Sequence, residues 1–244
     1  MVKAAVKKIV MVACGIQRRV RVMRLVSALD SRATSGRRTA VPDPVEMRAT
    51  TADRDRLRAE WGMDQGRYWY LIIGLITTRK NVDIILDGLV RYAQRPSGIV
   101  IAGEVDAQVA QQISARVTLL ADGDVSMRTV DRLLSDWEFD AAISAADCVV
   151  TAHSNDSPSG VLVKAALAGT RIVAAGAPSL REDCTRLADS AHWVPLRLDA
   201  IGAALARSAE LPRPRGEATS SGRQFASAML WSAFDTTGRS RVTR

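Results

Sequence analysis

From about residue 68 onward, short apolar runs alternate with segments of helical periodicity. Residues 68–74 (YWYLIIG) and 97–103 (SGIVIAG) are continuous apolar runs that end in glycine, as expected for strands covered on both faces. Between them, apolar side chains recur at the spacing of one helix face: Val82, Ile85, Leu86, Leu89, Val90 and Ala93. The pattern predicts a strand, a helix and a second strand in succession.

This alternation continues to about residue 211. We expect further strands near 127–131, 147–152, 171–175 and 193–195. We expect further helices over 105–120, 138–145, 159–168, 180–188 and 199–211, with Gly169 as a left-handed C-cap. Strands that are each followed by a helix predict an α/β fold, a doubly wound parallel sheet of about six strands that is Rossmann-like. Ligands of such sheets bind at the carboxyl ends of the strands.

Two segments lie outside this unit. Residues 1–45 are basic and end in Val41-Pro42-Asp43-Pro44, whose prolines favour an extended connector. Residues 213–244 begin as a linker rich in Pro, Gly and Ser, and a short amphipathic helix is indicated later by Phe225, Met229, Trp231 and Phe234. We therefore expect a basic N-terminal arm (1–45), one main domain (46–212), and a linker, C-terminal helix and tail (213–244).

The positive charge is concentrated in the arm. The net charge is +8, and residues 1–48 alone hold 11 Lys or Arg against 3 Asp or Glu. Such an arm could bind nucleic acid or an anionic lipid surface, but a solvated segment or part of a partly lost domain is the favoured explanation, and we expect no nucleic-acid partner. Arg outnumbers Lys 29 to 5, which we attribute to the coding bias of a bacterial genome.

Cysteine and apolar content restrict the remaining classes. The chain has 3 cysteines, far apart and without Cys-x-x-Cys spacing, so neither a disulfide framework nor a zinc site is indicated. The longest uncharged apolar stretch near either end covers residues 9–16, whereas a membrane-spanning helix needs about 20 residues. We expect a cytoplasmic protein, with peripheral association at the inner face of the membrane as an alternative.

The loop after the first strand carries two adjacent cations. It begins at Gly74, where backbone can approach a ligand, and it places Arg79 and Lys80 just before a helix whose free N–H groups favour anions. Phosphate is the ligand that such a loop would be expected to bind. The alternative is a solvated corner, which Arg-Lys at a helix start usually forms.

The loop after residues 147–152 has a similar character. Ser159 can cap the next helix, Gly160 leaves the N–H groups of its first turn unobstructed for a phosphate or a sugar hydroxyl, and Asp156 lies at the mouth. The carboxylate of Asp156 can accept hydrogen bonds from hydroxyl groups. The alternative is an ordinary polar turn between a strand and a helix.

No residue stands out as a catalytic group. His153 ends a strand on the ligand edge, where a catalytic imidazole is conceivable, but a polar turn residue is the simpler interpretation. Ser157 and Ser159 lack the Gly-x-Ser-x-Gly context of a nucleophile elbow. No acidic cluster or histidine spacing resembles a metal site.

Taken together, several strings carry a resemblance to a known family: VPDPV, GLITTRKNVDIILDGL, IVIAGEV, SAADCVVTAH, SPSGVLVKAALAGTRIVAAGAPSLRE and HWVPL. In this order, over about residues 40–211, they resemble the C-terminal, donor-binding half of family 4 glycosyltransferases. Those enzymes have two facing Rossmann-like domains, and the second one holds most of the nucleotide sugar. The resemblance implies that Lys80 and Arg79 hold the donor diphosphate and that Gly74 gives it room. It also implies that the backbone of Ser159, Gly160 and Val161 meets the phosphates.

The family's Glu-x7-Glu pair falls on Asp156 and Lys164. Asp156 keeps a carboxylate for the donor sugar, whereas Lys164 replaces the carboxylate that grips the ribose, and an ammonium cannot accept those hydrogen bonds. The family's N-terminal acceptor domain also needs far more residues than precede VPDPV here. The resemblance therefore implies a truncated or split enzyme, with a separate chain as one source of the acceptor domain.

The implied reaction is hexosyl transfer from a nucleotide-diphosphate sugar to a lipid, a glycan or a small-molecule acceptor, without a tightly bound cofactor or metal. One alternative is a non-catalytic nucleotide or nucleotide-sugar binding protein, which Lys164 and the short N-terminal segment favour. A second alternative, a nucleic-acid or membrane associated protein that uses the basic arm, is favoured by charge alone.

Overall fold

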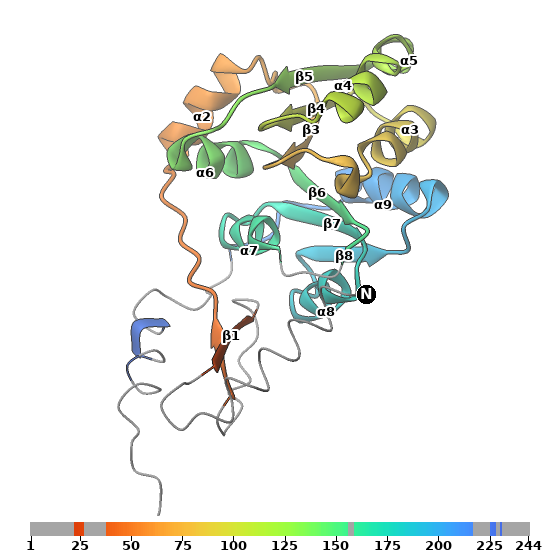
Figure 1. Cartoon of the computed structure of the whole chain (residues 1–244). Coiled ribbons are helices and arrows are strands. Elements are labelled where there is room, and N and C mark those ends of the chain that lie inside the picture. Colours follow the sequence, from red (N-terminus) through yellow and green to blue (C-terminus); the bar gives the residue numbers. More distant parts are fainter. Residues whose placement is uncertain (1–21, 27–37, 156–158, 217–224, 228–229, 231–244) are drawn as a thin grey trace, which may run out of the picture. The chain divides into compact units, whose positions relative to one another are not determined.

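The computed structural model describes residues 22–26, 38–155, 159–216, 225–227 and 230 (Figure 1). The chain forms two compact units, Glu46–Ala218 and a smaller one made of Met1–Val45 with Thr219–Arg244. In the smaller unit, β1 (Val22–Val26) pairs in parallel with β2 (Arg38–Pro42). The sequence did not predict this pair of strands. Of the expected C-terminal helix, residues 225–227 and 230 are helical, while Met229, Trp231 and Phe234 lie outside the described residues.

The larger unit contains one parallel sheet of six strands in the order β5-β4-β3-β6-β7-β8. Its strands are β3 (Tyr68–Ile73), β4 (Ser97–Ala102), β5 (Val125–Val130), β6 (Cys148–His153), β7 (Arg171–Gly176) and β8 (Ala191–Val194). All six lie close to the predicted runs, and the doubly wound, Rossmann-like α/β fold expected from the sequence is confirmed. The strand order reverses between β3 and β6, which is where doubly wound sheets bind their ligands.

The ladder at this reversal is short. Strand β3 pairs with β4 along its whole length, from Tyr68↔Ser97 to Ile73↔Ala102. With β6 it pairs only at Tyr70↔Cys148 and Leu71↔Val149. The two central strands therefore separate before they reach their carboxyl ends, and the loops that follow them must fill the gap.

Helices cover both faces of the sheet (Figure 1). They are α2 (Thr51–Glu60), α3 (Val82–Tyr92), α4 (Ala107–Ser114), α5 (Val117–Asp122), α6 (Asp136–Ala145), α7 (Gly160–Leu167), α8 (Pro178–Arg186) and α9 (Leu198–Glu210). Helix α3 packs against α9, and α2 packs against α6. No helix among the described residues is both long enough and apolar enough to cross a membrane.

Two helical regions differ from the sequence-based expectation. The single helix expected over 105–120 is two helices, α4 and α5, because Arg116 leaves the helix and its guanidinium binds Asp87 of α3 through Nε (2.6 Å) and Nη2 (2.9 Å). Helix α2 was not predicted at all. Its start carries a capping box between Thr50 and Asp53, a signal that was present in the sequence.

Two tyrosines of β3, the half-buried Tyr68 and the buried Tyr70, attach α9 to the sheet. Tyr70 Oη donates to the Leu205 carbonyl oxygen at 2.8 Å, and Tyr68 Oη donates to the Ser208 carbonyl oxygen at 3.0 Å. Burial raises the pKa of both hydroxyls well above the usual range, so they remain neutral donors. Beneath this face lies an aliphatic core built from β3, β4, α3 and α9, which includes Ile72, Ile85, Leu86 and Ile101.

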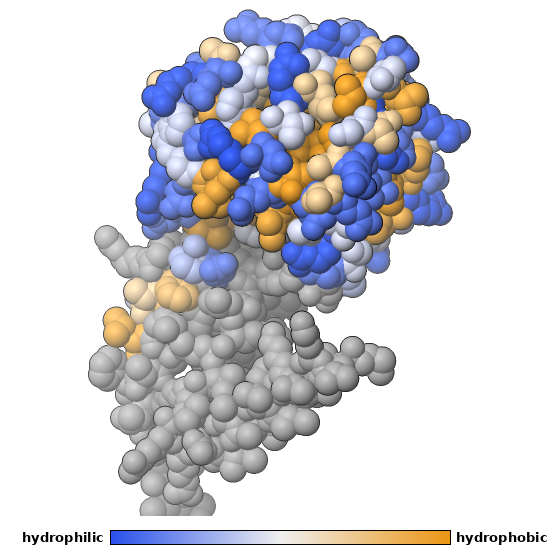
Figure 2. Space-filling view, turned by 45° about the horizontal axis from the view of Figure 1, so that its top comes forward, coloured by the Kyte–Doolittle hydropathy of each residue, from blue (hydrophilic) through white to orange (hydrophobic). Residues whose placement is uncertain are grey.

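Strand β5 is one edge of the sheet, and its side chains range from the buried Val125 to the exposed Arg128 and Thr129. The face drawn in Figure 2 mixes polar and apolar side chains. Helix α5, which packs against β5, exposes Val117 and Leu119. The charged Arg128 on β5 is exposed and bonds Ser126 Oγ at 3.1 Å, and charged side chains on an edge strand discourage pairing with another sheet.

Glycines make the tight turns at the carboxyl edge possible. Gly74 follows β3 with φ +99°, and Gly103 follows β4 with φ +126°. A Cβ on Gly103 would overlap the carbonyl oxygen of Gly74, so the two turns pack backbone against backbone. The end of β3 is held in place by this contact and by the Gly74 N–H, which donates to the Ala102 carbonyl at 3.0 Å.

We predict that Gly103→Ala destabilises the domain by about 2–3 kcal/mol, because it combines a strained φ with a collision against the Gly74 backbone. Gly160→Ala is the control, since a Cβ there meets no atom of the described residues within 4 Å, and we expect a change below about 1 kcal/mol. Urea unfolding followed by circular dichroism measures both. Equal stabilities of the two variants would contradict the close packing of these turns.

Candidate functional site

Lys80 folds back onto the end of β3. After Gly74 the chain forms the short 3-10 helix η1 (Thr78–Lys80), and Lys80 Nζ donates to the Ile73 carbonyl oxygen at 2.8 Å. A Cβ added to Gly74 would lie 3.9 Å from Lys80 Nζ. The structure thus brings together Gly74 and Lys80, two of the residues that the sequence singled out.

The charge of Lys80 is held in a partly buried position. Burial, with a smaller contribution from Arg79, lowers the pKa of Lys80 to about 8, so most of it is still protonated at pH 7. No carboxylate among the described residues pairs with Lys80 or with Arg79, which is exposed and bonds Thr77 Oγ1 at 3.4 Å. Two uncompensated cations therefore lie at the carboxyl edge beside the reversal of strand order.

Asn81 joins the loop after β3 to the end of β6. Its Nδ2 donates to the carbonyl oxygens of Ala152 at 2.8 Å and Arg79 at 2.9 Å, and Ser154 N donates to the Arg79 carbonyl at 3.3 Å. Its backbone is left-handed, with φ 47°, which asparagine tolerates better than most residues. Sequence reasoning missed this residue, although an asparagine between Arg-Lys and a helix start was a usable signal.

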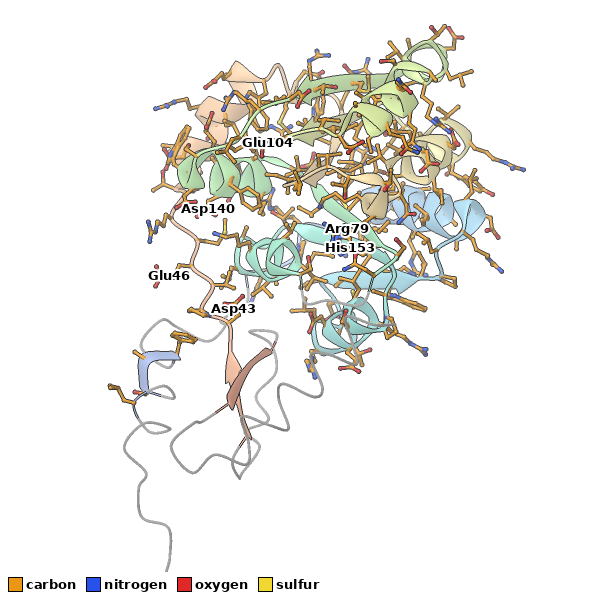
Figure 3. All side chains as sticks on the ribbon, viewed as in Figure 1. Asp43, Glu46, Arg79, Glu104, Asp140 and His153 are labelled. Atoms are coloured by element: carbon orange, nitrogen blue, oxygen red, sulfur yellow. The ribbon has the colours of Figure 1, made fainter. Side chains whose placement is uncertain are left out.

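His153 ends β6 next to this loop (Figure 3), and its Nε2 lies 3.0 Å from Thr151 Oγ1. Burial lowers its pKa to about 4, and the positive charges of Lys80 and Arg79 contribute. The imidazole is therefore neutral at pH 7. It can form hydrogen bonds to a ligand, but it adds no charge to the site.

The start of α7 is open. Ser159 is buried and caps the helix, its Oγ accepting from Leu162 N at 3.4 Å. A Cβ on Gly160 would meet no atom of the described residues within 4 Å, and Val161 is half-buried. The first-turn N–H groups thus start at an unobstructed glycine. Asp156, which the sequence placed at the mouth of this loop, lies outside the described residues.

Lys164 is bound to other protein groups. Its Nζ lies 2.5 Å from Asp140 Oδ1 of α6 and donates to the Glu46 carbonyl at 2.7 Å. The Asp140 side chain is 2% exposed, and its Oδ2 accepts from Arg48 N at 2.9 Å. Figure 3 shows Glu46 on the segment that leads into the domain and Asp140 at α6. Lys164 thereby attaches α7 to α6 and to residues 46–48.

The described part of the site offers a limited chemistry. It contains two cations, a neutral imidazole and an open helix start at the carboxyl ends of the strands. Together these groups suit an anionic ligand that carries phosphate and hydroxyl groups. Within the described residues, no group of three or more His, Cys, Asp or Glu is placed to hold a metal ion.

We predict that Lys164→Glu lowers the free energy of unfolding by about 2–4 kcal/mol, because it places a second carboxylate against the buried Asp140. Lys164→Arg keeps the cation and is the matched control, for which we expect a smaller loss. Urea denaturation at pH 7 compares the two. A Lys164→Glu variant as stable as the wild type would show that this side chain is not needed to neutralise Asp140.

Comparisons with known proteins identify the fold. No protein-family model and no curated protein matches the sequence. Solved structures that resemble the chain include HepE of Anabaena in complex with UDP and glucose, with 14% identity and a TM-score of 0.56 over 80% of this chain and 51% of that one. WaaG, a glycosyltransferase involved in lipopolysaccharide biosynthesis, has 12% identity and a TM-score of 0.58 over 83% of this chain and 53% of its own.

Sucrose-phosphate synthase from Thermosynechococcus elongatus is a third similar structure, with 17% identity and a TM-score of 0.57 over 82% of this chain and 50% of its own. The chain thus spans about half the length of each of these three structures. At such identities the likeness concerns the fold alone. The larger unit of this chain has the Rossmann-like α/β fold found in glycosyltransferase structures.

Proposed function

We propose that this chain is the donor-binding half of a family 4-like glycosyltransferase and holds a nucleotide-diphosphate sugar where β3 and β6 separate. The observation that carries the proposal is Lys80, an uncompensated cation fixed on the last carbonyl of β3 at the reversal of strand order. Arg79 adds a second charge, and the open start of α7 at Gly160 offers N–H groups from the neighbouring loop. A diphosphate between these elements would be bound from two sides.

The remaining predicted site residues fit this proposal in different ways. Gly74 leaves room beside Lys80, Ser159 presents the α7 start, and Val161 follows in its first turn. Asp156 is proposed to accept hydrogen bonds from the donor sugar. Lys164 is not expected to contact the donor in this arrangement, since its ammonium group binds the Asp140 carboxylate and the Glu46 carbonyl.

UDP-glucose is the first donor to test, because HepE is described with UDP and with UDP-glucose. The acceptor, a lipid, a glycan or a small molecule, would be presented by a facing domain, supplied by a separate chain if the enzyme is truncated or split. No tightly bound cofactor is needed for this reaction.

A second candidate function is a nucleotide-sugar binding protein without transferase activity. The ion pair between Lys164 and Asp140 favours it, because this position of α7 then offers the ribose no acceptor. Binding without transfer distinguishes this candidate from the enzyme.

We predict that Lys80→Met weakens the binding of UDP by about tenfold to a hundredfold, equivalent to about 1.5–3 kcal/mol for a charge-assisted contact. Methionine keeps an apolar stem and removes only the ammonium. Because the pKa of Lys80 is about 8, wild-type affinity should also fall as the pH rises from 7 to 9.5, while the variant should lack this fall. Isothermal titration calorimetry across this pH range measures both effects.

Arg91→Met is the control for this experiment, since it removes one exposed cation from the far end of α3. We expect its affinity for UDP to equal that of the wild type. GDP and ADP titrations on the same proteins report the preferred base. Identical affinities of the wild type and Lys80→Met would reject the role of Lys80.

We predict further that the chain by itself transfers sugar poorly and instead retains UDP-glucose or hydrolyses it slowly. Transfer requires two reactants held in line, and alignment of this kind contributes about 7–11 kcal/mol to lowering a barrier. A UDP-release assay over a range of protein concentrations tests this, because a second copy of the chain could take the place of the facing acceptor domain. Rapid transfer to a defined acceptor by a dilute monomer would contradict the prediction and exclude the binding-protein alternative.

A further inference from the structure

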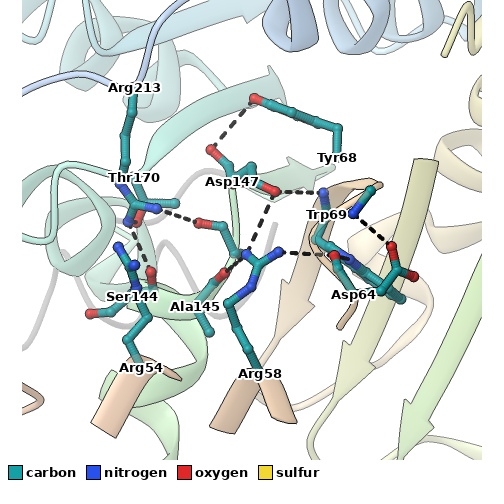
Figure 4. A network of polar contacts seen from close by, with 12 residues as sticks. Arg54, Arg58, Asp64, Tyr68, Trp69, Ser144, Ala145, Asp147, Thr170 and Arg213 are labelled. Carbon is teal, nitrogen blue, oxygen red and sulfur yellow. Dashed lines mark hydrogen bonds and ion pairs between the residues drawn. The ribbon is translucent and has the colours of Figure 1, made fainter. Parts of the chain in front are cut away.

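At the amino ends of the strands, opposite the candidate donor site, several arginines lie around the end of α6 (Figure 4). The last carbonyl groups of a helix have no partner within the helix. Here Arg58 Nη1 donates to the Ala145 carbonyl at 2.6 Å, and Arg213 donates to the carbonyls of Ser144 at 2.9 Å and Ala146 at 3.2 Å. Side chains from α2 and from the segment after α9 thus meet at the amino ends of β3 and β6.

These two arginines belong to a larger pocket of about 380 Å³. Its cationic lining comes from four parts of the chain: Arg54 and Arg58 of α2, then Arg67, Arg95 and Arg213. Among the described residues, the acidic side chains that line it are Asp55 and Asp147. A volume of this size is sufficient for a small organic ligand.

Carboxylates balance only part of this charge. Arg54 pairs with Asp55 at 3.0 Å, and Arg58 lies 3.7 Å from Asp147. The Asp147 Oδ2 atom also accepts from Trp69 N at 2.8 Å, so its charge is shared. Arg67 pairs outside the lining, with Asp124 at 2.8 Å and Asp64 at 3.5 Å.

Arg95 and Arg213 have no carboxylate partner among the described residues. Arg95 donates through Nη1 to the Ala209 carbonyl at 2.8 Å and lies over the Tyr68 ring at 5.6 Å. The pKa of Arg213 is lowered, first by burial and then by the charges of Arg54 and Arg58. Positive charge is therefore concentrated here beyond what the protein neutralises.

The guanidinium groups also keep N–H donors available. Each guanidinium has five N–H donors in a planar fork. Among the described residues, Arg54 bonds through Nε to Asp55 and Arg95 bonds through Nη1 to Ala209, so most donors of both groups have no protein partner. Planar forks of this kind bind phosphate oxygens in pairs, a geometry that lysine cannot provide.

We propose that this pocket, defined by the five arginines above, binds a small, multiply charged phosphate compound at the edge of the sheet opposite the candidate donor site. The ligand class is a soluble diphosphate or a phosphorylated small molecule. Its oxygens would accept from the guanidinium groups of Arg54, Arg95 and Arg213. Because Arg58 and Arg213 also hold the end of α6, a bound anion would strengthen the contact between α2, α6 and the segment after α9.

The test uses the full chain carrying Lys80→Met, so that a diphosphate bound at the other edge does not obscure the result. We expect inorganic pyrophosphate to bind this parent saturably in isothermal titration calorimetry and to raise its melting temperature. Added separately to the parent, Arg54→Gln and Arg95→Gln should each weaken binding by about tenfold or more. Neither arginine holds the end of α6. Arg54→Gln should melt at the temperature of the parent, whereas Arg95→Gln loses the bond to the Ala209 carbonyl and should melt slightly lower while remaining folded.

Arg197→Gln is the matched control, since Arg197 also pairs with a nearby aspartate, Asp199 at 3.3 Å, and does not line the pocket. It should bind pyrophosphate as the parent does. Absence of saturable binding to the parent, or equal weakening in the control, would overturn the proposal. Binding to phosphatidylglycerol vesicles without binding to pyrophosphate would also overturn it, because the ligand would then be a membrane surface.

Discussion

The candidate site depends on the early separation of β3 and β6. These strands pair at two positions and then diverge, which leaves the Ile73 carbonyl without a strand partner on that side. Lys80 supplies the missing donor, and Asn81 supplies another to Ala152 across the gap. Buried carbonyl groups need hydrogen-bond partners, so satisfying the opened ladder also places a cation at the point where the sheet can receive a ligand.

The polarity of the parallel sheet gives its two edges opposite requirements. At the carboxyl edge, helices begin, and the open start of α7 offers N–H groups to an anion. At the amino edge, helices end, and their bare carbonyls require donors, which Arg58 and Arg213 provide to α6. The arginines that complete a helix there also create a pocket with an excess of positive charge. The polarity of the sheet thus accounts for groups suited to anions at both ends of its strands.

Several features were predictable because their signals are local. Apolar runs ending in glycine located β3 and β4, and the expected left-handed conformation of Gly169 is observed with φ +61°. The Arg79-Lys80 pair was recognised from its position before a helix. Helix α2 was missed because its mean apolar content is low, although Thr50 and Asp53 carried a capping signal. The split between α4 and α5 was missed because Arg116 leaves the helix to bind Asp87, a residue 29 positions earlier.

The sequence by itself determined the alternation of strands and helices from β3 to α9, the parallel sheet and the loops that carry the candidate site, because periodicity and turn residues act over a few neighbouring positions. Only the tertiary structure decided the partners of the charged side chains. Lys164 meets Asp140, 24 positions away, and arginines from residue 54 to residue 213 gather in one pocket. Charge pairing acts through space at a few ångströms, and no local pattern in the chain records which distant groups packing will bring within that range.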